Sequence, residues 1–112
     1  LEKRAVDILQ PDFTWGGGMT EAWKAHTIGE MAGMATIPHG GANNPFGQHF
    51  AMAATESPMA EYWMGSDPGV PLDETVRIPG TVVPVNGTVR PSNEPGFGMQ
   101  FEPSDISDWG AN

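Results

Sequence analysis

The sequence predicts an α/β fold built on parallel strands, because two short apolar segments flank one amphipathic segment near its start. We expect a strand over residues 6–13, a helix over 21–33 and a second strand over 34–38. This order is typical of a βαβ unit, whose two strands lie parallel in one sheet. A third strand is predicted over 59–64.

Local signals place the boundaries of the first elements. Pro11 stands at the end of the first strand, where a missing N–H is tolerated. The glycines at 16–18 predict a turn that leaves room for close backbone approach beside Asp12, and Thr20 is the expected N-cap of the helix. Gly33 is a plausible C-cap. The expected buried stripe of the helix consists of Ala25, Ile28, Met31 and Ala32.

The second half of the chain changes character after residue 65. Before it, a short helix is predicted over 47–55, with Phe50, Ala53 and Ala54 facing a core. After it, closely spaced Pro, Gly and Asn signals predict an irregular, β-rich tail with one hairpin formed by 82–85 and 88–89. We therefore divide the chain into residues 1–66 and a tail over residues 67–112.

Composition excludes several classes of function. The 112 residues suit one small domain, and the net charge of −9 opposes binding to nucleic acid or to an anionic membrane surface. The absence of cysteine excludes a disulfide scaffold and a zinc–thiolate site. No apolar run approaches the roughly 20 residues of a membrane span. We expect a cytoplasmic protein and, since Leu1 is not an initiator Met, a chain that begins within a longer sequence.

Asp12 and His39 follow the two predicted parallel strands, each at the carboxyl end. In a right-handed βαβ unit these two ends lie close together. A carboxylate beside an imidazole orients the ring and raises its basicity, which would produce a general base. From the residues alone, a purely structural hydrogen bond remains the commoner interpretation of such a pair.

Other polar residues give weaker signals. Glu61 lies on the third predicted strand, on the same face as Trp63, and either has a role in the site or faces solvent at an edge. His26 is expected at the surface, and His49 is expected to pack or to form a hydrogen bond. His39 and His49 do not have a recognisable metal-ligand spacing.

Several short motifs recur along the chain in a fixed order: residues 9–15, 17–21, 37–41, 48–50, 57–62 and 95–98. In order and separation these motifs resemble the enolase superfamily, in particular its mandelate-racemase-like acid-sugar dehydratases, such as the L-rhamnonate dehydratases. The resemblance extends along nearly the whole chain, and the separation of Asp12 and His39 also fits. The departures are Gly16, where relatives often have another residue, and the variable loop at 42–45.

The resemblance implies that residues 1–66 are the last βα units of a modified TIM barrel and that the tail packs on a capping domain. It implies a lyase that removes the proton α to the carboxylate of a sugar acid and eliminates water. His39 would be the base, or the acid that assists the leaving hydroxyl, Asp12 would hold and polarise His39, and Glu61 would bind the substrate carboxylate or enediolate. Trp15 and Gly40 would shape the substrate pocket.

The resemblance also implies Mg²⁺, with its three carboxylate ligands on upstream strands and no metal ligand in this segment, and a homo-oligomer. Two alternatives stay open. The chain alone could be a catalytically incompetent fragment, because a barrel missing strands leaves unpaired edges. It could also be a small acidic binding module that uses its tail for contacts.

Overall fold

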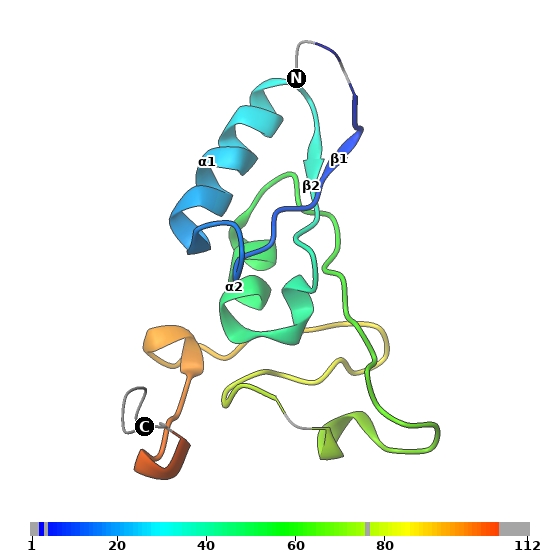
Figure 1. Cartoon of the computed structure of the whole chain (residues 1–112), viewed down its shortest axis with the longest axis vertical. Helices are drawn as coiled ribbons and strands as arrows, with labels where there is room; N and C mark the ends of the chain where they lie inside the picture. The colour runs from blue at the N-terminus through cyan, green and yellow to red at the C-terminus, as the bar shows by residue number, and fades with distance from the viewer. Residues whose placement is uncertain (1–2, 4, 76, 106–112) are drawn as a thin grey trace, which may run out of the picture.

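The computed structural model describes residues 3, 5–75 and 77–105, and two parallel strands lie at the centre of its first half (Figure 1). Strand β1 (Ile8–Leu9) pairs with β2 (Ala35–Thr36). Two backbone hydrogen bonds extend the pairing, from Ile37 N–H to Leu9 O at 2.8 Å and from His39 N–H to Pro11 O at 3.2 Å. The predicted parallel arrangement is confirmed, although the regular strands are shorter than expected.

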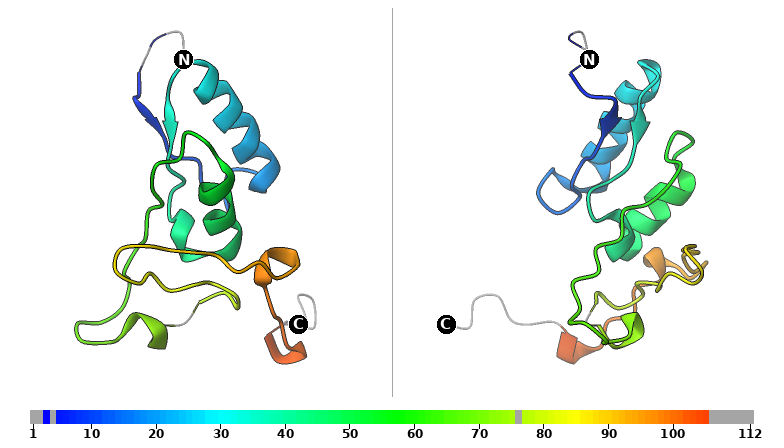
Figure 2. Two further views of the ribbon diagram at one scale, coloured as in Figure 1. Left: turned by 180° about the vertical axis from the view of Figure 1, so that it is seen from behind. Right: turned by 90° about the vertical axis from the view of Figure 1, so that its right-hand side faces the viewer.

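Helix α1 (Gly18–Met31) connects the two strands and lies against one side of the pair (Figures 1 and 2). Its N-cap is Gly17, with a left-handed φ of 93° and no side-chain cap, so the prediction of Thr20 as N-cap is wrong. At the other end Gly33 has φ 70° and donates to Glu30 O, while Met34 N–H donates to Gly29 O, both at 2.9 Å. This pair of bonds is a Schellman motif, which confirms Gly33 as the residue that terminates the helix.

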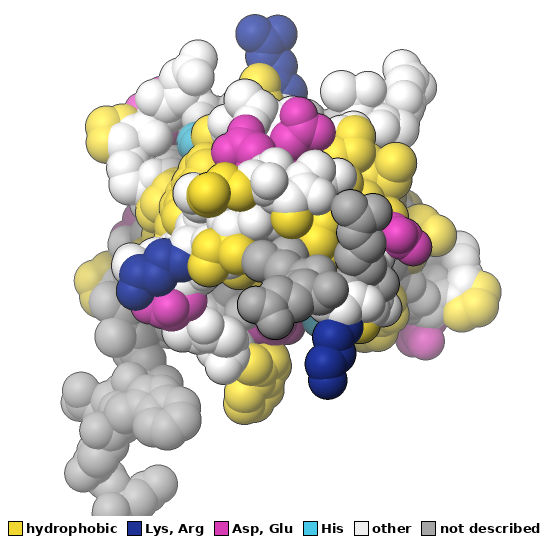
Figure 3. All heavy atoms as spheres, turned by 90° about the horizontal axis from the view of Figure 1, so that it is seen from above, with side chains coloured by type: hydrophobic (Ala, Val, Ile, Leu, Met, Phe, Trp, Pro, Cys, Tyr) yellow, Lys and Arg dark blue, Asp and Glu magenta, His cyan; other side chains and the backbone are white. Residues whose placement is uncertain are grey.

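The buried face of α1 differs from the predicted stripe. Ile28 and Met31 are 51% and 85% exposed. Hydrophobic side chains are accordingly visible at the surface where Figure 3 views this end of the molecule. A Cβ added to Gly29 would lie 2.4 Å from Leu9 Cδ1, so the helix approaches β1 at its smallest residue. The close approach of α1 to β1 at Gly29 decides which face of the helix is buried. The buried residues of the helix are Ala22, His26 and Gly29.

The predicted third strand over 59–64 is not a regular strand. The chain over residues 56–63 is extended beside β2 and the loop that follows it. Thr36 N–H donates to Glu56 O at 2.9 Å, and Ala42 N–H donates to Glu61 O at 2.8 Å. These bonds are too widely spaced for a ladder, and Pro58 has no N–H to contribute. The segment nevertheless runs parallel to its neighbour, because residues 36 and 42 bond to residues 56 and 61 in the same order.

Helix α2 (Pro45–Ala53) lies beyond the carboxyl ends of the strands (Figure 1). Asn44 caps it by accepting a hydrogen bond from Gly47 N–H at 2.6 Å, and Pro45 occupies the first turn, where its missing N–H costs nothing. Phe50 and Ala54 are buried as predicted, whereas Ala53 is exposed. The core of the chain joins both helices and the turn after β1: Phe13, Ala22, Phe50 and Ala54.

The tail is irregular but not β-rich, which corrects the prediction. Its described part, 67–75 and 77–105, contains three 3₁₀ turns: Leu72–Glu74, Gly96–Gly98 and Pro103–Asp105. The predicted hairpin is present as one antiparallel bridge between Val85 and Thr88, around Asn86 and Gly87 with positive φ. Residues 106–112 of the predicted tail lie outside the described residues. None of the described helices has the length and apolarity to cross a membrane.

Gln48 joins the tail to the first half of the chain. Its buried amide nitrogen donates to Ala42 O at 2.8 Å and to Val82 O at 2.7 Å, and its amide oxygen accepts from Val82 N–H at 3.1 Å. One side chain therefore satisfies backbone groups on both sides of the junction.

We predict that Gln48→Met lowers the free energy of unfolding by about 2–3 kcal/mol, because it leaves three backbone groups without partners. In the complete protein, limited proteolysis should cut within 83–90 faster than in the parent. Met52→Gln, at an exposed position of the same helix, is the matched control and should change neither quantity. Equal cleavage rates in all three proteins would contradict the role of Gln48.

Candidate active site

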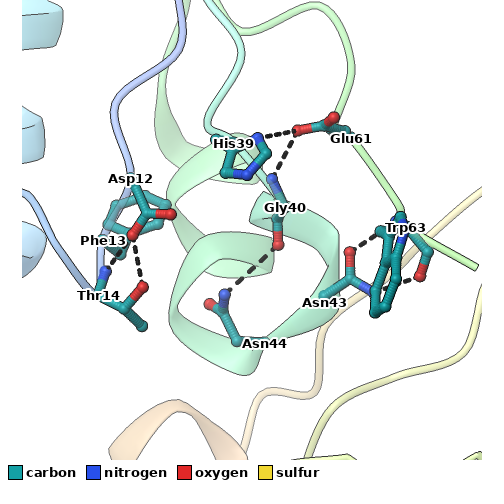
Figure 4. Close-up of a pocket in the computed structure, with 9 residues that line it drawn as sticks. All are labelled: Asp12, Phe13, Thr14, His39, Gly40, Asn43, Asn44, Glu61 and Trp63. Atoms are coloured by element: carbon teal, nitrogen blue, oxygen red, sulfur yellow. Dashed lines mark hydrogen bonds and ion pairs between the residues drawn. The ribbon is translucent and has the colours of Figure 1, made fainter. Parts of the chain in front are cut away.

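A pocket of about 380 Å³ lies where the chain leaves the two parallel strands and meets the extended segment after α2 (Figure 4). Asp12 and Trp63 flank it on opposite sides, with His39 and Glu61 between them (Figure 4). The pocket is therefore lined by both polar and aromatic side chains. The lining residues are Asp12, Phe13, Thr14, His39, Gly40, Asn43, Asn44, Glu61 and Trp63.

His39 is paired with Glu61 in the pocket. His39 Nδ1 lies 3.1 Å from Glu61 Oε2, and the two side chains are 63% and 39% exposed. An ionised carboxylate only accepts hydrogen bonds, so the imidazole carries its hydrogen on Nδ1 and leaves Nε2 as the basic nitrogen. Gly40 N–H donates to the same Glu61 oxygen at 2.6 Å and fixes the carboxylate beside the ring.

Asp12 is held by its own turn. Its Oδ1 accepts hydrogen bonds from Thr14 N–H at 2.7 Å, from the Thr14 hydroxyl, and from Trp15 N–H at 2.9 Å. The Thr14 hydroxyl, followed by the Trp15 N–H, lowers the pKa of Asp12, and the charge of nearby His39 adds to this lowering. Asp12 is therefore a carboxylate at neutral pH.

The predicted dyad is only partly formed. The extended strand pairing brings Asp12 and His39 to the same pocket, as the sequence indicated. Among the described residues, however, the hydrogen-bond partner of His39 Nδ1 is Glu61 and not Asp12. The three hydrogen bonds that Asp12 Oδ1 accepts come from Thr14 and Trp15.

The two residues expected to shape the pocket have different outcomes. Gly40 lines it and holds Glu61. The Trp15 side chain is 91% exposed and does not line the pocket, because the turn uses only its backbone N–H. Gly16 behaves as expected, since its N–H donates to Asp12 O at 2.9 Å and a Cβ there would lie 2.5 Å from that oxygen.

Neither of the other two histidines belongs to the pocket. His26 is buried, which corrects the surface prediction; its Nδ1 lies 3.1 Å from Thr36 Oγ1 and its ring packs on Phe50. Its ring, hydrogen-bonded inside the core, has a structural role. His49 packs edge-on against Phe97, as the prediction of a packing role required.

Comparisons with known proteins identify the family. The sequence model described as "Enolase C-terminal domain-like" matches residues 1–105. The chain belongs to this family. A relative from Caldivirga maquilingensis, described as "Putative L-rhamnonate dehydratase", is 37% identical over 108 residues, which cover 90% of this chain and 25% of the relative. No solved structure matches the chain.

Membership of the enolase family explains the architecture. The C-terminal domain of the family is a TIM-barrel-type α/β fold, in which catalytic groups lie at the carboxyl ends of the strands. The described residues contain one βαβ unit with an adjacent extended segment rather than a closed barrel. The chain spans about a quarter of the length of the curated relative that it matches.

The family resemblance implies a magnesium site whose three carboxylate ligands lie on strands upstream of the described residues. Within 3, 5–75 and 77–105, no three His, Asp or Glu side chains lie close enough together to hold a metal ion. Asp12 directs Oδ1 at its own turn, and Glu61 directs Oε2 at His39 and Gly40. One oxygen of each carboxylate is therefore already engaged within the chain.

Sequence reasoning missed five pocket residues: Phe13, Thr14, Asn43, Asn44 and Trp63. Two of them carried local signals. Thr14 follows Asp12 at the spacing of a turn closed by the aspartate side chain, and Asn44 before Pro45 is a typical helix start. Trp63 was expected on the same strand face as Glu61, whereas Asn43 had no such signal, because it meets Trp63 only through the tertiary fold.

We predict that Thr14→Val raises the pKa of Asp12 toward its ordinary value of about 4, because the mutant lacks the hydroxyl that most favours the carboxylate. The carboxyl-carbon chemical shift of Asp12, titrated with pH in the complete protein, measures this. Thr14→Ser keeps the hydroxyl and should titrate like the parent.

The same variant should change stability in acid. A depressed folded pKa contributes stability above the ordinary value, and this contribution is lost as pH falls through the folded pKa. Thr14→Val should therefore lose less stability than the parent on acidification below about pH 4. Identical titrations of the Val and Ser variants would contradict this account.

Proposed function

We propose that this chain carries the acid–base half of the active site of a sugar-acid dehydratase. The observation that carries the proposal is the His39 imidazole, which lines an open pocket with Nδ1 3.1 Å from Glu61 Oε2. The similarity to a relative described as an L-rhamnonate dehydratase supports the substrate class. The family match along residues 1–105 favours this function over that of a small binding module.

The chemistry requires a base beside a carbon-bound hydrogen of very low acidity. In our proposal His39 Nε2 accepts the proton α to the substrate carboxylate, and the C–H electron pair forms a carbon–carbon double bond. The β-hydroxyl leaves as water after it takes a proton from the imidazolium, and the resulting enol becomes a 2-keto-3-deoxy acid. The imidazole is neutral again at the end, so one proton shuttle serves both steps.

Each neighbour of His39 has a part in this step. Glu61 keeps the hydrogen on Nδ1 and stabilises the imidazolium that forms. Asp12, a carboxylate at neutral pH, favours the same cation through its charge. Gly40 N–H holds the Glu61 oxygen against the ring at 2.6 Å. These fixed neighbours therefore stabilise the imidazolium form of His39, which exists between the two proton transfers.

The proposal extends to parts of the complete protein beyond this site. It includes Mg²⁺ bound by residues other than those described, a sugar acid (an aldonate) as substrate, and a cytoplasmic homo-oligomer. It also includes the packing of the tail on a capping domain. These properties of the complete protein are proposed from the family resemblance.

We predict that His39→Asn in the complete protein lowers kcat by at least about 1000-fold, because the amide cannot accept the α proton. The apparent Kd for L-rhamnonate should change little. Turnover measured as 2-keto acid formation checks the first statement and calorimetry the second. A variant that keeps most of its kcat would overturn the assignment of His39.

We predict that Glu61→Gln and Asp12→Asn each lower kcat by about 10- to 100-fold and change KM much less, because both act on the charge of the imidazolium. Asp7→Asn, at an exposed aspartate before β1, is the control and should leave both constants unchanged. Small and equal effects of Asp12→Asn on kcat and KM would indicate a purely structural Asp12.

A further inference from the structure

The indole of Trp63 forms the side of the pocket that the proposed chemistry does not use. It lies across the pocket from Asp12 (Figure 4) and is 73% exposed, although tryptophan is normally well covered. Asn43 and Trp63 also line an adjoining cavity of about 550 Å³, and they are the two residues that both cavities share. The indole therefore stands at the boundary between the acid–base groups and this second space.

Asn43 fixes the backbone of Trp63 from both sides. Its amide oxygen accepts from Trp63 N–H at 2.7 Å, and its amide nitrogen donates to Trp63 O at 2.8 Å. The side-chain amide thus pairs with a peptide group as a neighbouring strand would. Ala42 N–H to Glu61 O, at 2.8 Å, anchors the same segment two residues earlier. An exposed aromatic residue is held here at a defined place.

Gly65 leaves the room that the ring occupies. A Cβ added at Gly65 would lie 2.2 Å from Trp63 Cζ3 and 2.3 Å from Cη2. Real Cβ atoms do not make such contacts, so the indole rests on the space that the missing side chain leaves. The backbone bond pair and the glycine together indicate that the orientation of the indole is built into the segment.

We propose that Trp63 is a stacking platform for the carbon chain of the sugar acid and that Asn43 and Gly65 are its positioning residues. This inference rests on the proposed function. A polyol acid presents hydroxyl groups, and between them C–H groups that the neighbouring oxygens polarise positively. The electron-rich face of an indole attracts such C–H groups, while the carboxylates of Asp12 and Glu61 can accept hydrogen bonds from hydroxyls.

The division of the pocket matches this ligand. Asp12 lies at one side of the pocket and the large indole of Trp63 at the other, with His39 and Glu61 between them. A small acid without a polyol chain would leave the indole unused. A sugar acid whose reacting carbon lies at His39 extends the remaining carbons along the pocket, and the indole covers the side opposite Asp12.

The test measures binding without turnover. In the complete protein carrying His39→Asn, calorimetry gives the Kd for L-rhamnonate, so the readout does not depend on catalysis. We expect Trp63→Ala to raise this Kd by roughly 5- to 10-fold and Trp63→Phe, which keeps an aromatic face, to raise it by about 2-fold or less. Met59→Ala, at an exposed position earlier in the same segment, is the control and should leave the Kd unchanged.

A double-mutant cycle tests the positioning residue. Gly65→Ala should raise the Kd when Trp63 is present and should have no further effect in Trp63→Ala, because its only expected action is to displace the indole. An equal effect of Gly65→Ala in both backgrounds would overturn the role of Gly65. Thermal melts of each variant show whether the protein is folded.

The outcomes separate this inference from the proposed function. If the His39→Asn protein binds L-rhamnonate and Trp63→Ala leaves the Kd unchanged, the platform is refuted and the proposed function stands. If the His39→Asn protein and its parent bind no sugar acid, the proposed function fails and the platform with it. A rise in Kd that Trp63→Phe reverses supports both.

Discussion

The candidate site depends on one irregular extension of parallel pairing, in which Pro11 O accepts from His39 N–H. Proline contributes only its carbonyl here, since it has no N–H. The bond places Asp12 and His39, which follow the two strands, at neighbouring positions above the core. Without it, the regular pairing would end at Leu9 and Thr36, and nothing in the backbone would hold the two side chains at one pocket.

The turn after β1 and the loop after His39 each present polar groups to the pocket. Asp12 accepts three hydrogen bonds from Thr14 and Trp15, so its carboxylate is ionised and fixed. The loop after His39 offers the Gly40 N–H, which binds Glu61 from a segment far along the sequence. Local turn chemistry thus fixes Asp12, and the long-range contacts of Glu61 with Gly40 and His39 place a second carboxylate beside the imidazole.

Several elements of the fold show which features local sequence patterns can predict. The βαβ order, the glycine that ends α1 and the Asn-Gly hairpin followed from local rules and are confirmed. The buried stripe of α1 did not follow, because the helix packs on β1 through Gly29, and hydrophobicity says nothing about where the closest approach occurs. For the same reason His26 lies in the core, where it forms a hydrogen bond with Thr36 and packs against Phe50.

The sequence alone determined the family, the parallel βαβ unit, and the presence of Asp12, His39 and Glu61 near its strand ends, because these depend on motifs and on the handedness of the connection. Only the tertiary structure decided that the imidazole pairs with Glu61 instead of Asp12, that Trp15 faces solvent, and that Trp63 closes the pocket. Those outcomes depend on how residues 56–65 run beside the loop at 40–43. The physical reason is that a long-range hydrogen bond, such as that from Asn43 to Trp63, joins residues whose local sequence contains no pattern that predicts it.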